Sequence, residues 1–147
     1  MHHYTNCGLD YVWLVNGFEH VETPHGPGIR IHDLAGLQRA IADRVISAPT
    51  RLRGQEVRFL RSMLDVSQDG LARVLGQTRP SVARWEGERD KPIPGASDRA
   101  LRLYYAAQMA GGEAAKRMSD LLKELDEIQH GDREERFTDD DGWKAAA

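Results

Sequence analysis

The sequence predicts a mainly helical α+β protein, with a small β segment near its N-terminus followed by helices. Three observations predict this class. An Asn16-Gly17 pair lies between two short apolar and aromatic runs, which is typical of a β-hairpin. From residue 34 onward, apolar residues recur at helical spacing. The 147 residues are 40% hydrophobic and 29% charged, a composition typical of globular proteins.

Composition also excludes several classes. No apolar run approaches the ~20 residues that a membrane span requires. The first residues contain neither a basic region nor an apolar one, so no signal peptide is predicted. Cys7 is the single cysteine, which excludes an internal disulfide and a multi-cysteine zinc site. We therefore expect a cytoplasmic protein without a membrane partner.

The N-terminal unit, residues 1–48, is predicted to be a hairpin followed by a helix. The hairpin strands are residues 11–15 and 18–23, joined by a type I′ turn at Asn16-Gly17. A stiff loop at residues 24–28 ends the hairpin, and residues 29–31 add a short third strand. Asp33 caps the helix, which ends at Ala48-Pro49-Thr50. The apolar positions of this helix are Leu34, Leu37, Ile41 and Val45. We expect the unit to serve dimerisation or partner binding.

Residues 51–110 are predicted to form four helices. The first spans residues 55–64, with Val57, Leu60 and Leu64 on one face. Ser67 caps the second, which ends at Gly76. Thr78 caps the third, with Pro80 in its first turn. After a loop at residues 87–95, the fourth begins at Ser97 or Asp98 and continues to about Met109. The inward positions of the last three helices are Leu71, Ala72, Leu75, Val82, Trp85, Leu101, Tyr104 and Tyr105.

The C-terminal part is predicted to be an amphipathic helix over residues 113–129 and an acidic, flexible tail over residues 130–147. The apolar stripe of the helix consists of Met118, Leu121, Leu122, Leu125 and Ile128. Two interpretations of this stripe remain open. It packs on the helix of residues 98–109 of its own chain, or it helps to build a homodimer.

Charge is unevenly distributed along the chain. Residues 51–110 carry eleven Arg and Lys against seven Asp and Glu, a net charge of +4, whereas residues 111–147 carry a net charge of −5. A basic central segment beside acidic segments indicates a nucleic-acid-binding module whose flanking segments have another function.

The most informative stretch is Ser67 to Glu86, SQDGLARVLGQTRPSVARWE. It predicts two short helices joined by Gly76-Gln77-Thr78. A turn this short makes the helices cross steeply, so that the first turn of the second helix is exposed. Such a helix can enter the DNA major groove, which is ~12 Å wide.

Residues 54–105 resemble a helix-turn-helix domain of the phage-repressor (Xre-like) type. The matching residues are Ser67-Gln68, Leu71-Ala72, Leu75-Gly76, Ser81-Val82 and Arg84-Trp85-Glu86. A narrower set also resembles the DNA-binding half of the MqsA (YgiT-type) antitoxins, which pair with an mRNA-cleaving toxin and repress their own operon. That set is Arg58-Phe59-Leu60-Arg61, Arg84-Trp85-Glu86, Pro92-Ile93-Pro94-Gly95 and Asp98-Arg99. Those antitoxins carry a four-cysteine zinc domain that this chain lacks, so zinc is not carried over.

The resemblance assigns roles by position. The predicted base-reading residues are Arg79, Pro80, Ala83 and Arg84. The predicted phosphate-contacting residues are Ser67, Gln68, Gln77, Thr78, Ser81, Arg89 and Lys91. Structural roles fall to Trp85 as a core residue and to an ion pair between Arg61 and Glu86. Alternatively, Arg79 is a solvated surface charge, and Arg84 contacts a phosphate rather than a base.

Metal binding and catalysis have little support. One cysteine and five histidines fall within the first 32 residues, but their spacing does not match a metal site: His2, His3, Cys7, His20, His25 and His32. Nothing near Cys7 predicts a lowered pKa or an oxyanion site. No cofactor, metal or enzymatic activity is expected.

The leading hypothesis is therefore a transcriptional repressor that binds double-stranded DNA as a homodimer on an inverted repeat. It would autoregulate its own operon. The alternative is an antitoxin whose N-terminal unit or acidic tail neutralises a basic toxin, with DNA binding serving only autoregulation.

Overall fold

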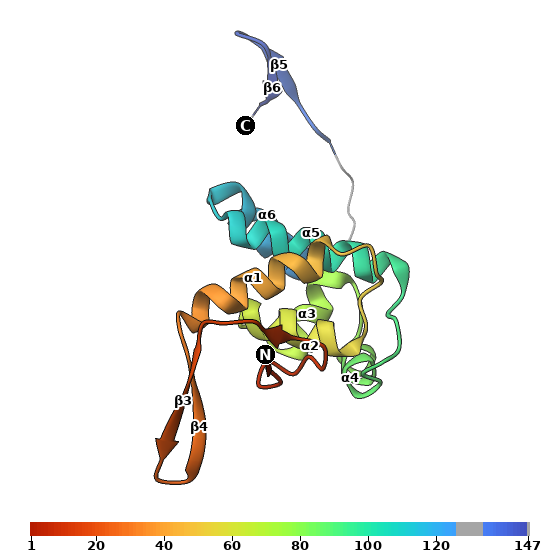
Figure 1. The fold of residues 1–147 in the computed structure, drawn as a ribbon. Coiled ribbons are helices and arrows are strands. Elements are labelled where there is room, and N and C mark those ends of the chain that lie inside the picture. The colour runs from red at the N-terminus through yellow and green to blue at the C-terminus, as the bar shows by residue number, and fades with distance from the viewer. Residues whose placement is uncertain (126–133, 147) are drawn as a thin grey trace.

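The computed structural model describes residues 1–125 and 134–146, and within them the protein is mainly helical. Figure 1 shows the helices gathered into one body, with a long hairpin extending from it. The described helices are α1 (Leu34–Ser47), α2 (Gly54–Leu64), α3 (Gln68–Leu75), α4 (Arg79–Gly87), α5 (Gly95–Ala110) and α6 (Glu113–Glu124). The described strands are β1 (His2–His3), β2 (Trp13–Leu14), β3 (Phe18–Thr23), β4 (Gly26–Ile31), β5 (Phe137–Asp139) and β6 (Trp143–Ala145).

The hairpin differs from the predicted one. β3 pairs with β4, in a register that runs from Phe18 opposite Ile31 to Thr23 opposite Gly26. The prediction that residues 11–15 pair with 18–23, with a loop at 24–28, was therefore wrong. Pro24 and His25 form the turn, and a backbone fixed by proline suits the first central position. The Thr23 hydroxyl reinforces the turn by donating to the Gly26 carbonyl at 2.6 Å.

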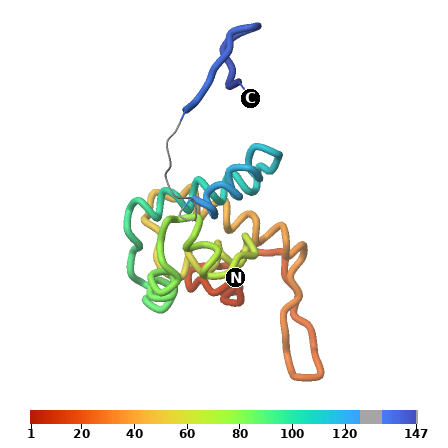
Figure 2. Tube along the Cα trace, turned by 180° about the vertical axis from the view of Figure 1, so that it is seen from behind, coloured from red at the N-terminus to blue at the C-terminus, as the bar shows by residue number. Residues whose placement is uncertain are grey.

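Residues 11–15 instead belong to the helical body. β2 pairs with β1, and Leu14 is buried in the core, so this segment is held by long-range packing. Asn16-Gly17 links β2 to β3, with Gly17 at a φ of 79°. Figures 1 and 2 show from opposite sides that β3 and β4 project away from the helices. The predicted strand at residues 29–31 is confirmed as the end of β4.

The predicted helix caps are confirmed. The Asp33 side chain accepts from the Gly36 N–H, and the Ser67 hydroxyl accepts from the Gly70 N–H at 2.9 Å. Thr78 caps α4 by accepting from the Ser81 N–H at 3.3 Å. α3 ends at Gly76, whose φ of 65° is a left-handed conformation that glycine adopts without strain.

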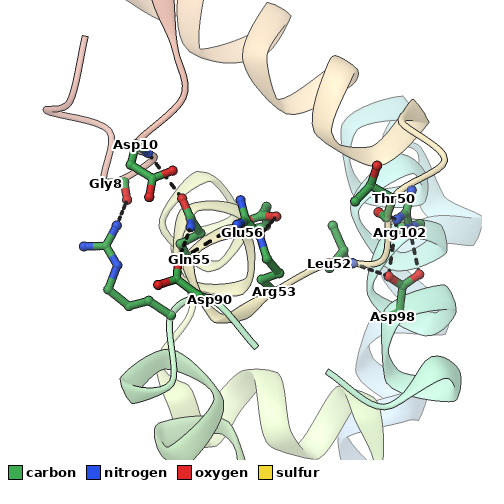
Figure 3. Close-up of polar contacts among 11 residues, drawn as sticks. Gly8, Asp10, Thr50, Leu52, Arg53, Gln55, Glu56, Asp90, Asp98 and Arg102 are labelled. Carbon is green, nitrogen blue, oxygen red and sulfur yellow. Dashed lines mark hydrogen bonds and ion pairs between the residues drawn. The ribbon is translucent and has the colours of Figure 1, made fainter. Parts of the chain in front are cut away.

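α5 begins at Gly95, earlier than the predicted start at Ser97 or Asp98. The Asp98 side chain does not cap the helix, because it accepts from the Leu52 N–H at 2.6 Å and from Arg102 at 2.8 Å. Burial opposes its ionisation, but these hydrogen bonds outweigh burial and lower the pKa of Asp98. Arg102 also donates to the Ala48 carbonyl at 2.7 Å. The α1–α2 connection is thus fixed onto α5 (Figure 3).

A single hydrophobic cluster contains residues from both sides of the predicted boundary near residue 50. Tyr4, Leu9 and Leu14 from the N-terminal segment belong to the same cluster as the helical core. The predicted inward positions Leu71, Ala72, Val82, Trp85, Leu101, Tyr104 and Tyr105 are buried, whereas Leu75, also predicted, is only half-buried against this core. The division into units at residues 48–51 stays a prediction.

At the C-terminal side, α6 is described as far as Glu124, and the rest of the predicted helix, including Ile128, lies outside the described residues. β5 and β6 pair, with Phe137 opposite Ala145, so the segment predicted to be a flexible tail contains a hairpin, and its flexibility stays a prediction. The Asp139 carboxylate accepts from the Gly142 N–H at 3.1 Å and closes the turn. Among the described helices, none is long and apolar enough to cross a membrane.

Candidate nucleic-acid interface

α3 and α4 pack together across the turn formed by residues 76–78. The Gln77 N–H donates to the Ala72 carbonyl at 2.8 Å, which ties the turn to the end of α3. α4 then starts at Arg79, with the Thr78 and Ser81 hydroxyls 3.0 Å apart at its N-terminus. The turn thereby fixes the direction in which α4 leaves α3.

α4 has a buried side and an exposed side. Val82, Trp85 and Glu86 are buried, in agreement with the predicted core role of Trp85. The four predicted base-reading residues, Arg79, Pro80, Ala83 and Arg84, are all exposed. Such a division follows from the helical period of 3.6 residues. The exposed side begins at the first turn of the helix.

The two arginines on this exposed side have free donor groups. Within the part of the chain that the structure describes, no hydrogen bond or ion pair reaches the guanidinium of Arg79 or Arg84. Each guanidinium presents N–H donors in a planar fork. Such a fork can donate two hydrogen bonds to the O6 and N7 atoms of guanine, or contact a phosphate.

The predicted ion pair between Arg61 and Glu86 is present, and it anchors α4 on α2. Arg61 Nε lies 2.8 Å from Glu86 Oε2, and Arg61 Nη2 lies 2.9 Å from Glu86 Oε1. The hydrogen bond that Arg61 donates to Glu86 raises the pKa of the Arg61 guanidinium. Arg61 also donates to the Val66 carbonyl at 3.1 Å, so it connects the α2–α3 loop to α4.

A close backbone contact also holds the C-terminal end of α4 and the loop that follows it. The Gly54 N–H donates to the Lys91 carbonyl at 3.3 Å, and the Gln55 N–H donates to the Arg89 carbonyl at 3.1 Å. A Cβ atom at Gly54 would lie only 1.8 Å from the Trp85 carbonyl oxygen. α2 and α4 can approach this closely only because residue 54 is glycine.

Comparison with protein-family models, with curated proteins and with solved structures finds no match to this chain. The evidence for the candidate interface therefore comes from the sequence and geometry of this chain.

The predicted phosphate-contacting residues fall into three groups. Thr78 and Ser81 lie at the first turn of α4 with the exposed arginines, and Gln77 is exposed beside them in the turn. Ser67 and Gln68 lie at the N-terminus of α3. Arg89 and Lys91 lie in the loop after α4, and both cations have protein partners. Arg89 donates to the Gly8 carbonyl at 2.8 Å, and Lys91 Nζ lies 3.8 Å from Glu88.

Arg58 is a candidate that the sequence prediction gave no role. Its side chain is exposed on α2, and it lines a polar pocket of about 330 Å³ together with Arg89 and Glu86. Helical spacing could have identified Arg58 as an exposed residue, because it lies off the buried face formed by Val57 and Leu60. A second cation beside Arg89 would extend the positive surface at the end of α4.

The N-terminal histidines make ring contacts. His3 stacks on Trp13 at 4.3 Å between ring centroids, and His2 lies 5.5 Å from Phe18. In residues 1–125 and 134–146, no three His, Cys, Asp or Glu side chains are grouped so that they could hold a metal ion.

Proposed function

We propose that this protein is a sequence-specific DNA-binding repressor, in which α3, the turn and α4 act as a helix-turn-helix and α4 enters the major groove. One observation carries the proposal. α4 is anchored at its inner side by Trp85 and the Arg61–Glu86 pair, while Arg79 and Arg84 are exposed and have no partner among residues 1–125 and 134–146. A rigid helix with unpaired arginines at its first turns fits base reading, because the geometry of a bidentate contact must be fixed before binding.

Arg79→Ala tests base reading. We expect the substitution to weaken binding to the operator by ~1–3 kcal/mol and to relax the preference at one position of each half-site. Binding to unrelated DNA should change much less. Arg30→Ala is the matched control, because Arg30 is an exposed arginine on the β3–β4 hairpin. Mobility shifts on the DNA upstream of the gene measure both variants, and equal operator affinity for Arg79→Ala and the wild type would show that Arg79 does not read bases.

We further propose that the repressor binds as a homodimer, since one recognition helix reads too few base pairs for genomic specificity. α6 supports this idea. Its Ser119 side is buried, with the Ser119 hydroxyl 3.1 Å from the Tyr104 hydroxyl. Apolar residues of α5, of α6 and of the position just after α6 remain exposed on the same chain: Leu103, Met118, Leu121 and Leu125. Among the described residues of the stripe, Leu122 is half-buried, whereas Met118, Leu121 and Leu125 are available to a second copy, so both interpretations of the stripe stay open.

Replacing Leu121 and Leu125 by Asp tests this surface. Each leucine is about half exposed, so the monomer should remain folded. Burial of an aliphatic side chain is worth ~1.5–3 kcal/mol, and we expect the double variant to be monomeric and to bind operator more weakly. Sedimentation velocity measures the state of assembly. A double variant that stays dimeric would move the dimer contact to the N-terminal hairpin.

One observation favours a second function as an antitoxin. The β5–β6 hairpin carries exposed Phe137 and Trp143 next to the three acidic residues 139–141. Aromatic side chains among negative charges suit a basic protein surface. Co-expression with the product of a neighbouring gene for a small basic nuclease tests this function. Neutralisation that is lost when residues 134–147 are deleted would support it, and neutralisation that persists would argue against this hairpin.

A further inference from the structure

A pocket of about 790 Å³ lies between residues 10–14, α1 and the connection that leads into α2. Its walls are mainly apolar and include Trp13, Leu37, Ile41, Val45 and Leu52. Small-molecule sites in proteins have volumes of about 300–1,000 Å³ and similar apolar walls. The pocket is separate from the exposed side of α4.

Glu56 gives this apolar pocket an unsatisfied acceptor. Its side chain lines the pocket and is only 7% exposed. Oε1 accepts from Arg53 Nε at 3.1 Å, whereas Oε2 is buried without a hydrogen-bond partner among the described residues. A buried carboxylate oxygen without a donor is unfavourable, so a ligand that supplies one gains binding free energy.

Tyr11 and Arg53 lie beside this carboxylate. The Arg53 guanidinium is 5.6 Å from the centroid of the Tyr11 ring, and both residues line the pocket. Burial and the negative charge of Glu56 raise the pKa of Tyr11 to about 12, so its phenol stays neutral at physiological pH.

We propose that this pocket binds a small apolar amine, with the hydrocarbon against Ile41, Val45 and Leu52. Its ammonium donates to Glu56 Oε2 once Tyr11 or Arg53 shifts aside to uncover that buried oxygen. A carboxylate accepts hydrogen bonds and cannot donate them, so a ligand with a donor is required. An ammonium supplies both the donor and the opposite charge. An acidic ligand would instead use Arg44 or Arg53, which also line the pocket, and would leave Glu56 Oε2 without a donor.

The polar side of the pocket is connected to the loop after α4. Arg53 pairs with Pro92 in an isolated β-bridge. Gln55 donates to Asp90 at 3.2 Å and accepts from the Asp10 N–H at 3.2 Å (Figure 3). A ligand that displaces Tyr11 or Arg53 therefore changes the environment of residues 89–92. The binding site stands independently of DNA binding, and only an effect of the ligand on operator affinity rests on the proposed function.

Three probes with one hydrocarbon body test the proposal: naphthylethylamine, naphthylethanol and naphthylacetate. Each is titrated into the full-length protein while backbone amide shifts are recorded. We expect the amine to shift the amides of Ile41, Val45 and Leu52 saturably and to bind about tenfold more tightly than the acid. The amides of residues 89–91 should shift with the same midpoint.

Two variants and a control make the assignment specific. Glu56→Gln should weaken binding of the amine about tenfold and leave binding of the alcohol nearly unchanged. Ala40→Trp, at an exposed position that lines the pocket, should block all three probes without unfolding the protein. Glu22→Gln, on the β3–β4 hairpin, should have no effect. Thermal unfolding verifies that each variant is folded.

The outcomes separate the two parts of the proposal. Three results would each overturn the site. The amides of Ile41, Val45 and Leu52 could fail to shift saturably, the amine and the acid could bind with equal affinity, or the Glu56→Gln variant could bind the amine as tightly as the wild type does. Shifts in the pocket without shifts at residues 89–91 would leave the site in place and overturn its connection to the loop.

Discussion

Gly54→Ala is expected to lower the free energy of unfolding by about 3 kcal/mol or more, or to prevent folding altogether. The added Cβ would lie 1.8 Å from the Trp85 carbonyl oxygen and 2.9 Å from the Glu88 carbonyl oxygen. Both obstacles are backbone atoms, so no side-chain rotation relieves the clash. The start of α2 would have to move away from α4, with loss of the hydrogen bonds to residues 89 and 91.

Gly87→Ala is the matched control for this substitution. Gly87 is also helical and exposed, but a Cβ at this position meets nothing within 4 Å. Alanine is preferred over glycine in helices, so stability should stay the same or rise slightly. Urea unfolding followed by circular dichroism measures both variants. A stability of Gly54→Ala within 1 kcal/mol of the wild type would mean that α2 and α4 are not in this close contact.

Arg61→Ala is expected to lower the free energy of unfolding by about 3–5 kcal/mol. It would leave the Glu86 carboxylate, whose side chain is 6% exposed, without its bidentate partner. The Val66 carbonyl would lose a donor as well. Because Glu86 lies on α4, a loosened helix should also weaken operator binding.

The double variant Arg61→Met with Glu86→Leu separates two contributions to the free energy of unfolding. One is the destabilisation by an unpaired buried charge, and the other is the net contribution of the ion pair. Replacing both partners of a buried pair by apolar residues is often close to neutral. We therefore expect the double variant to be more stable than Arg61→Ala. Chemical unfolding of both provides the comparison. If Arg61→Ala unfolds with the wild-type midpoint, the pair does not anchor α4.

The sequence was sufficient to predict those features of the structure that depend on residues close together in the chain. Ser67 and Thr78 cap helices because their hydroxyls reach N–H groups three residues onward. Gly76 ends α3 because its φ of 65° is accessible to glycine. The buried side of α4 followed from helical spacing alone. These features define most of the candidate interface, and they were predicted at the correct positions.

Pairing over longer distances was not predictable in the same way. Asn16-Gly17 and Pro24-His25 are both acceptable two-residue turns, and local propensity favours the first. The structure uses the second, because Leu14 is buried in the core and β2 pairs with β1. The pocket around Glu56 was also missed, since residues 10–14, α1 and α2 supply its walls from separate parts of the chain.

The most direct test of DNA binding through α4 is the salt dependence of binding to the DNA upstream of the gene. Fluorescence anisotropy at increasing KCl gives the association constant for the wild type and for Arg84→Ala. The account predicts that log K falls linearly with log salt, by about 0.9 for each neutralised phosphate, with several phosphates for each half-site. Arg84→Ala should either reduce this slope by about one unit or relax base preference. A slope near zero for the wild type, or no binding at low salt, would contradict the proposal.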